Sequence, residues 1–145
     1  MMLGELADAT SMRFKSLDQR RSVQIAAEAF SNEWLGLIVV CDTDDRAVGV
    51  VSKSDLVRHL AGNGSVNVPI TDVMTRSIVS ASPRDELRAT WEFMATRRLQ
   101  NLPLFDRDRR PVGTLDIRDA LKAVLDIEEE QGDQLINYIV GIGYR

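Results

Sequence analysis

The chain has 145 residues, of which 44% are hydrophobic, and a formal net charge of −4. This length suits one ordinary domain or two very small ones, and the hydrophobic content is sufficient for a packed core. The acidic balance argues against direct nucleic-acid binding, which needs a basic face, but it leaves room for small anionic ligands held by local groups. No apolar run approaches the ~18 residues of a membrane span, so no membrane attachment is expected.

The only cysteine, Cys41, ends the apolar stretch LGLIVVC. One thiol cannot form an intramolecular disulfide, so a reducing compartment is the simpler interpretation. The acidic N-terminus MMLGELADATSM is unlike a secretory signal, and a cytoplasmic location is therefore expected. Cys41 itself is expected to be a buried strand residue rather than a nucleophile.

Most of the sequence repeats itself with an offset of 64 residues. Gly49 falls on Gly113, Asp55 falls on Asp119, and apolar positions correspond in the same way. A fixed offset over this length indicates a duplicated structural unit. The predicted organisation is an N-terminal segment, a first repeat, a linker with a lead-in, a second repeat and a C-terminal helix or tail, with the bounds 1–12, 13–61, 62–76, 77–126 and 127–145.

The first repeat begins with a short extended piece, FKSL (14–17), which is followed by a helix. The apolar face of that helix is expected to contain Val23, Ala26, Ala27 and Phe30. Two strands, LIVVC and AVGVV, then flank the polar turn DTDDR. A second helix begins at SKSDLVRHLA, so the predicted order is β-α-β-β-α.

The linker GNGSVNVP, rich in Gly and Asn, leads to a second repeat of the same order. Here SIVSA (77–81) is extended, Ser82 is the expected helix N-cap and Pro83 the first helical residue. The strands LPLF and PVGTL flank DRDRR, and the last helix begins at DIRDALKAVL.

Past that helix, the tail segment EEEQGDQLINYIV is also expected to be helical. Its apolar positions are Leu135, Ile136, Ile139 and Val140. This tail either covers the core of its own module or packs on a second chain, and the second alternative is favoured.

The predicted fold belongs to the α/β (α+β) class, with two β-α-β-β-α repeats packed sheet to sheet under pseudo-two-fold symmetry. A single unit of ~50 residues would bury too little surface to be stable alone. Packing two units together solves that problem and leaves symmetric clefts between them, where small ligands usually bind.

The junction GVVSKSDL (49–56) returns as GTLDIRDA (113–120), at the point where a strand gives way to a helix. Ser52 and Asp55 can form a capping box, and Asp116 caps equally well, so helix capping alone would explain both copies. A second interpretation adds a ligand. The helix N-terminus attracts phosphate, a serine hydroxyl can donate to it, and an aspartate one turn later can accept from ribose hydroxyls.

Other candidate centres are weaker. The DTDD cluster lacks the turn glycine and the distal glutamate of a calcium loop, and His59 has no His or Cys cluster beside it. No nucleophile–base set, glycine-rich phosphate loop or pair of catalytic acids is present. Trp34 and Trp91 are expected to be core or interface residues rather than ligand platforms. We therefore expect neither an enzyme nor a metal site.

The segments DVMTRSIVSASP, LQNLPLFDRDRRPVGTLDIRDAL and GLIVVCDTDDRAVGVVSKSDL together resemble a tandem pair of cystathionine β-synthase (CBS) domains, also called a Bateman module. The resemblance covers about residues 10 to 126. It implies a regulatory module that needs no cofactor for chemistry and binds an adenosine-containing ligand such as AMP, ATP or NADH. It also implies a homodimer of CBS pairs.

By the same resemblance, two ligand sites lie in the clefts, each with an aspartate from one repeat and a base pocket largely from the other. The first site would use Asp55 for the ribose and the residues Ser52, Ser54, Val50, Gly36, Leu37, Thr71, Arg76, Leu99 and Gln100 around it. Family members often have a basic side chain near Gly36 and Leu37, and this sequence has none there. The second site, expected to be weaker because Asp116 faces the phosphate, would use Asp119, Asp116, Arg118, Asn101, Met12 and Leu35.

The expected function is that of a stand-alone adenosine-nucleotide sensor whose output passes through an unidentified effector protein. The alternative is a ligand-independent interaction scaffold in which both Ser/Asp-x-x-Asp junctions are only helix caps. A panel of adenosyl ligands would separate the two, because a bound ligand raises the free energy of unfolding.

Overall fold

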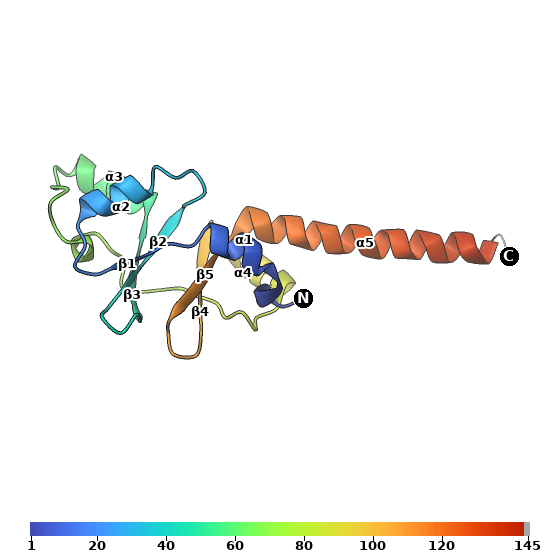
Figure 1. The fold of residues 1–145 in the computed structure, drawn as a ribbon. Coiled ribbons are helices and arrows are strands. Elements are labelled where there is room, and N and C mark those ends of the chain that lie inside the picture. Colours follow the sequence, from blue (N-terminus) through green and yellow to red (C-terminus); the bar gives the residue numbers. More distant parts are fainter. Residues whose placement is uncertain (144–145) are drawn as a thin grey trace.

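The computed structural model describes the backbone of residues 1–143 and the side chains of residues 1–132. Two small sheets lie next to each other at the centre of the molecule, with helices around them (Figure 1). This arrangement confirms the predicted α/β class. In chain order the elements are the 3-10 helix η1 (Leu3–Leu6), α1 (Ala7–Met12), β1 (Ser16–Asp18), α2 (Val23–Ala29), β2 (Leu37–Cys41), β3 (Ala47–Ser52), α3 (Lys53–Ala61), the 3-10 helix η2 (Ile70–Asp72), α4 (Leu87–Arg97), β4 (Asn101–Phe105), β5 (Pro111–Asp116) and α5 (Ile117–Gly143).

The two sheets repeat the same strand register. In the first sheet β1 is parallel to β2, and β2 is antiparallel to β3 with Leu37 opposite Ser52. The second sheet contains β4 and β5, with Asn101 opposite Asp116. The second pair lies 64 residues after the first in the sequence. Both ladders change register after the fourth residue of β2 or β4. The predicted duplication therefore extends to individual hydrogen-bonded pairs.

The two hairpin turns are also copies of each other. The carboxylate of Asp42 accepts hydrogen bonds from the backbone N–H groups two and four residues later, and Asp106 does the same in the second hairpin. Asp45 and Arg109, at matching positions, both have φ of 62°, a left-handed conformation that polar turn residues tolerate. The carboxylates at Asp42 and Asp106 thus organise the turns, as the sequence-based interpretation of a polar hairpin turn requires.

Three apolar clusters hold these elements together. The first lies inside the first repeat and includes Val23, Ile38 and Val51, while the second lies inside the second repeat. The third cluster joins the repeats, because β2 and β3 contribute Val39, Cys41 and Ala47, and β4 contributes Phe105. The two sheets therefore pack against each other, as predicted.

The N-terminal segment completes the core of the second repeat, although it begins the chain. Leu3 is fully buried in the second cluster, and the backbone N–H of Leu87 donates to the carbonyl of Met1 over 2.8 Å. In the first repeat, Ile70 of η2 is fully buried in the equivalent way. Each repeat is thus closed by the 3-10 helix that precedes the other repeat in the sequence.

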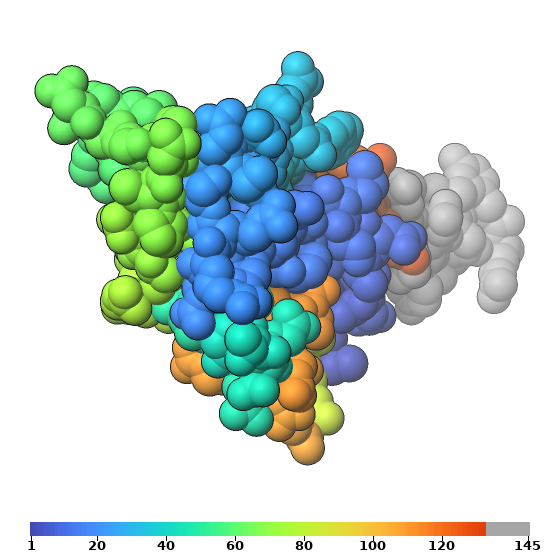
Figure 2. All heavy atoms as spheres, turned by 60° about the vertical axis from the view of Figure 1, so that its left-hand side comes forward, coloured from blue at the N-terminus to red at the C-terminus, as the bar shows by residue number. Residues whose placement is uncertain are grey.

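Helix α1 continues this exchange along the edge of the second sheet, where it packs against β5. A Cβ atom at Gly113 would lie 2.9 Å from Oγ1 of Thr10, so the glycine permits this close approach. The space-filling view, turned by 60°, shows the N-terminal residues in dark blue beside orange parts of the second repeat (Figure 2). Gly49, on the matching strand, faces Met74 in the same manner.

One predicted boundary is wrong. Helix α4 begins at Leu87, and its N-cap is Glu86, whose carboxylate accepts from the N–H of Ala89. The Ser82 hydroxyl instead accepts from the backbone N–H of Arg84 in a turn. Of the segment SIVSA, Ala81 forms an isolated bridge with Leu104. The physical reason is that residues 82–86 bind the N-terminal segment. The backbone N–H groups of Gly4 and Leu3 donate to the carbonyls of Pro83 and Asp85.

The tail helix is the continuation of α5, which extends well beyond the two sheets (Figure 1). An ion pair between Arg88 and Glu128 ties its first half to α4. The side chains of Leu135, Ile136, Ile139 and Val140 lie outside the described residues, so the two predicted roles of the tail stay open.

Candidate functional site

A pocket of about 580 Å³ lies where the two strand–helix junctions approach each other. Six pairs of its lining residues are 64 positions apart in the sequence, so the pocket straddles the pseudo-two-fold axis. These pairs are Trp34 and Arg98, Leu35 and Leu99, Gly36 and Gln100, Leu37 and Asn101, Ser52 and Asp116, and Ser54 and Arg118. Glu33 and Lys53 complete the lining.

The structure brings members of both predicted sites into this one pocket. From the first predicted site it includes Ser52, Ser54, Gly36, Leu37, Leu99 and Gln100, and from the second it includes Asp116, Arg118, Asn101 and Leu35. Six predicted residues do not line it, namely Asp55, Val50, Thr71, Arg76, Asp119 and Met12. The structure thus brings members of both predicted sites into one axial pocket, and the two separate clefts expected from the sequence stay a prediction.

The residues outside the pocket have other neighbours. Val50 pairs with Thr75 through backbone hydrogen bonds of 2.8 and 2.9 Å and packs between the sheets. Thr71 lies within η2, and Arg76 is exposed beyond it. Met12 lines a separate pocket of about 240 Å³, together with Phe14, Lys15, Ala29, Asn32 and Leu35. Leu35 therefore belongs to both pockets.

The first junction is a complete capping box. Ser52 Oγ accepts from the N–H of Asp55 over 3.2 Å, and Asp55 Oδ2 accepts from the N–H of Ser52 over 2.8 Å. Ser52 Oγ also lies 2.9 Å from Ser54 Oγ, so two hydroxyls sit at the N-terminus of α3. Among the described residues, the second Asp55 oxygen is contacted by Arg58 at 3.3 Å, and the Arg58 side chain is 76% exposed. This oxygen is therefore weakly held.

The second junction is internally neutralised. Asp116 accepts from the backbone N–H of Arg118 and from its guanidinium through Nε at 3.0 Å and Nη2 at 2.8 Å. Burial by itself raises the pKa of Asp116, but these hydrogen bonds and the charge of Arg13 outweigh it and hold the pKa below the usual value. The pairing raises the pKa of Arg118 in turn. Asp116 is therefore ionised, and its charge is compensated within the protein.

Arg13 binds the remaining carboxylate of the second junction. Its Nε and Nη2 donate to the two oxygens of Asp119 over 2.6 and 3.3 Å. Nη1 donates to the carbonyl of Trp34 over 3.3 Å and lies 3.5 Å from Asp116. The arginine is 8% exposed, while the Asp119 side chain is 26% exposed. Both oxygens of Asp119 are bound by this one buried guanidinium, whereas those of Asp55 are bound by the Ser52 N–H and by the exposed Arg58.

Several pocket residues were missed by the sequence-based prediction. Trp34 is 52% exposed and lines the pocket, so of the two predicted roles, core or interface, the core role does not apply to it, whereas Trp91 packs against the second cluster. Lys53 and Arg98 line the same pocket as Gly36 and Leu37, so they supply the positive charge that the sequence was expected to lack there. Arg98 could have been found from the repeat, because the offset of 64 residues pairs it with Trp34 in the other copy.

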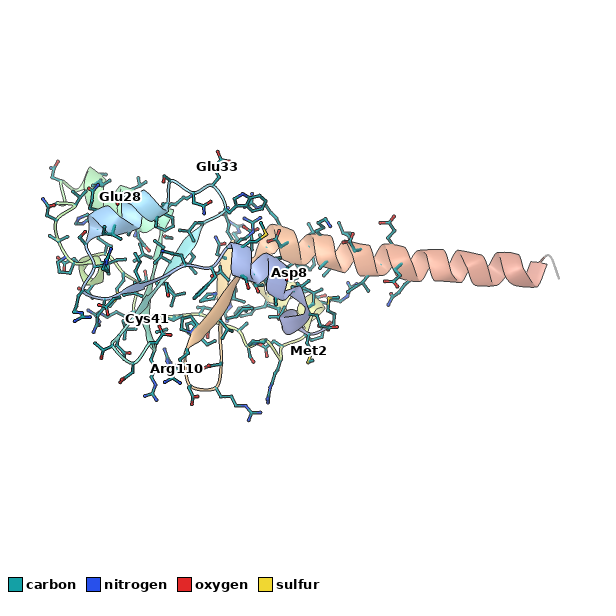
Figure 3. All side chains as sticks on the ribbon, viewed as in Figure 1. Met2, Asp8, Glu28, Glu33, Cys41 and Arg110 are labelled. Atoms are coloured by element: carbon teal, nitrogen blue, oxygen red, sulfur yellow. The ribbon has the colours of Figure 1, made fainter. Side chains whose placement is uncertain are left out.

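The loop between α2 and β2 forms one wall. Glu33 projects outward from this loop, on the side of the molecule where α5 begins (Figure 3). The Arg13 guanidinium lies 4.9 Å from the centre of the Trp34 ring, and this cation–π contact stabilises the loop. The wall is therefore tied to the second junction through Arg13.

Gly36 has a steric role in this wall. A Cβ atom there would come within 2.5 Å of Nδ2 of Asn101, so a larger residue at position 36 would force the Asn101 side chain to move. Oδ1 of Asn101 is buried and has no hydrogen-bond partner among the described residues. An unpaired buried amide oxygen is costly, and a ligand N–H or a water in the pocket would satisfy it.

Other predicted features have structural places. Cys41 is buried at the end of β2, and burial, with help from nearby aspartates, raises the pKa of its thiol to about 11 (Figure 3). The expectation of a buried strand residue is confirmed. Within the described part of the chain, no group of three His, Cys, Asp or Glu side chains could hold a metal ion. None of the helices searched there combines the length and apolarity needed to cross a bilayer.

The sequence profile of the CBS domain matches the chain twice, at residues 8–62 and 70–126. An uncharacterised 17.7 kDa protein of Acidianus ambivalens is 26% identical over 118 residues, which are 81% of this chain and 71% of that protein. The arabinose 5-phosphate isomerase GutQ of Escherichia coli is 28% identical over 102 residues, or 70% of this chain. That match spans only 32% of the isomerase.

Solved structures share the fold. A CBS-domain containing protein of Agrobacterium tumefaciens is 25% identical, with a TM-score of 0.72 and coverage of 85% of this chain and 98% of that chain. A CBS domain protein of Pyrobaculum aerophilum, complexed with AMP, is 22% identical, with a TM-score of 0.71 and coverage of 82% and 89%. The CBS domain pair of protein MJ0100, complexed with 5′-methylthioadenosine and S-adenosyl-L-methionine, is 19% identical, with a TM-score of 0.72 and coverage of 88% and 98%.

Proposed function

The chain belongs to the CBS domain family, and we propose that it is a regulatory module that binds an adenosine-containing ligand in the axial pocket. The observation that carries this proposal is the pocket lining, in which both junctions meet around Lys53, Arg98 and Arg118. Relatives of the same fold hold AMP or S-adenosyl-L-methionine, which supports an adenosyl ligand here.

The first junction is suited to the phosphate. The hydroxyls of Ser52 and Ser54 stand at the N-terminus of a nine-residue helix, where free N–H groups and the helix dipole favour an anion. Lys53, exposed between them, adds a full positive charge. Arg98 faces the same pocket from the opposite repeat. These groups offset the local negative charge of Glu33 and Asp116.

Asp55 is the proposed ribose acceptor. It does not line the axial pocket, so the ribose would lie beside the pocket, next to the start of α3, while the phosphate lies at Ser52 and Ser54. Among the described contacts, Oδ1 of Asp55 meets Arg58, whose side chain is 76% exposed and can be displaced by a sugar hydroxyl. The backbone bond from Ser52 holds the other oxygen and fixes the side chain in place. The carboxylate is thus oriented but still able to accept.

Titration calorimetry with AMP, ATP, NADH and S-adenosylmethionine tests the proposal. At least one ligand should bind, and a ligand at 100 times its Kd should add about 2.7 kcal/mol to the free energy of unfolding. Adenine-free ribose 5-phosphate serves as the control for simple anion binding. No heat and no thermal shift with any adenosyl ligand would contradict the proposal.

The alternative, a ligand-independent scaffold, is favoured by one observation. Ser52 and Asp55 already satisfy each other in a capping box, so the motif has a structural role without any ligand. The scaffold predicts that the same ligand panel leaves the melting temperature unchanged. The nucleotide sensor predicts a shift, so one experiment separates the two.

We further propose that an effector protein reads the bound state, that the module acts as a homodimer, and that it works in the cytoplasm. The exposed apolar residues Leu121 and Leu125 on α5 support an assembly surface, and the single, unpaired Cys41 suits a reducing compartment. Light scattering at micromolar concentration should report twice the 16.2 kDa chain mass. A monomer at that concentration would contradict the dimer.

A further inference from the structure

The two junctions differ in what occupies their aspartates. Asp119 receives a two-point contact from Arg13, at 2.6 and 3.3 Å, and the arginine side chain is only 9% exposed. Asp55 accepts from the Ser52 N–H on one oxygen over 2.8 Å, and its other oxygen is contacted at 3.3 Å by an arginine that is 76% exposed. A fork on both oxygens of Asp119 takes one acceptor position on each, so a pair of sugar hydroxyls would have to compete there with a buried, charge-assisted contact.

The difference comes from the lead-in segments and not from the junctions themselves. Arg13 follows α1, and the position 64 residues later is Ser77, an exposed residue without charge. Ser77 lies beyond the strand-edge contact of Thr75, as Arg13 lies beyond Thr10 and α1. The first junction therefore has no equivalent cation from its lead-in segment among the described contacts.

Arg13 also contacts the lining of the axial pocket. Its guanidinium contacts Trp34 and Asp116, which line that pocket, while its sequence neighbours Met12 and Phe14 line the pocket of about 240 Å³. Leu35 lines both pockets. Arg13 therefore links the second junction to the wall of the axial pocket.

We propose that Arg13 acts as an internal plug, which closes the second junction and limits the module to one adenosyl ligand per chain. The inference rests on the proposed function, since it takes Asp55 as the working acceptor. Removal of the plug would free Asp119 to accept from a second ligand. The residue that decides the number of ligands would then lie outside both strand–helix motifs.

Replacing Arg13 by its counterpart, Arg13→Ser, tests the plug. Calorimetry with AMP on the full chain should give one equivalent for the wild type and two for Arg13→Ser. The double variant Arg13→Ser/Asp119→Asn should return to one. Arg20→Ser, which removes an arginine that is 75% exposed, is the matched control and should keep one equivalent.

The outcomes separate the two proposals. Two equivalents in the wild type, or one in a folded Arg13→Ser, would overturn the plug but leave nucleotide binding intact. No binding by either protein would overturn the proposed function and the plug together.

A measurement on the wild type does not depend on how the variant folds. The Arg13 Nε–H should stay protected from exchange with solvent while the first equivalent of AMP is added, because its contact with Asp119 persists. Loss of this protection with the first equivalent would contradict the plug, even if Arg13→Ser fails to fold.

Discussion

The two repeats have matching backbone arrangements but differ in the contacts that hold their strand–helix junctions. Strand pairing and hairpin turns match position by position at the offset of 64 residues. Around Ser52 the closure is local, because the capping box lies within four residues. Around Asp116 the closure is long-range, because Arg13 reaches Asp119 from 106 residues away in the chain.

This comparison shows how a duplicated fold can acquire unequal sites. The backbone copies impose equal geometry, so any inequality must come from side chains that reach the junctions. Asp116 alone would repel a phosphate, but Arg118 and Arg13 compensate its charge. What distinguishes the second junction is that its acceptors are already used, and not that it carries an uncompensated charge.

The largest expected effect is on the free energy of unfolding, when the 3-10 helix that closes each repeat loses its buried side chain. Leu3→Ala should lower the free energy of unfolding by about 2–5 kcal/mol, because a fully buried leucine leaves a cavity. Ile70→Ala should cost a similar amount in the other core, and denaturant unfolding measures both. A loss below about 0.5 kcal/mol for Leu3→Ala alone would mean that the N-terminal segment does not close the second repeat.

The next effect compares the two aspartates in binding. Asp55→Asn keeps an oxygen for the Ser52 N–H but removes the charge, so it should weaken AMP binding by about 1.5–3 kcal/mol. Asp119→Asn should change the affinity little, since Arg13 already engages that side chain. Calorimetry on both variants decides which junction works. The reverse pattern would place the ligand at the second junction.

A pair of serine variants separates capping from ligand contact. Ser52→Ala should lower the free energy of unfolding by about 1 kcal/mol, because it removes the N-cap of α3. Ser54→Ala should leave stability within about 0.5 kcal/mol, because its side chain is exposed. Both should weaken AMP binding if both hydroxyls touch the phosphate. Unchanged affinity in both variants would favour the scaffold.

The smallest effect is on the pH dependence of stability. The folded-state pKa of Asp116 lies below its unfolded value of about 3.9, so the stability it contributes is present above that pH. This contribution disappears as the pH falls through the lowered folded-state pKa. Urea unfolding between pH 5 and pH 2 should therefore show a smaller acid-induced loss for Asp116→Asn than for the wild type. Equal losses would show that Asp116 is not stabilised by Arg118 and Arg13.

Much of the fold could be predicted because it depends on local patterns. The alternation of strands and turns repeats in the sequence, so the hairpins and the junction helices lie where the offset places them. The start of α4 was misplaced for a physical reason: the carbonyls of Pro83 and Asp85 bind the N-terminal segment, and this holds the segment before Leu87 out of the helix.

The candidate site could be predicted only in part. Ser52, Ser54 and Asp116 were identified from the junction motif and do line the pocket, but Trp34 and Lys53 were not. Nothing in the spacing of a loop residue such as Trp34 distinguishes an exposed wall from a buried core position. Its exposure depends on how the two repeats face each other.

The sequence by itself determined the duplication, the order of strands and helices, and the identity of both junctions, because period and capping preferences act over a few residues. The tertiary structure alone decided that Leu3 completes the second core and that Arg13 occupies Asp119. Those contacts join segments about 80 to 106 residues apart in the chain, so they form only when folding brings an apolar side chain into a distant core or an arginine to a distant carboxylate.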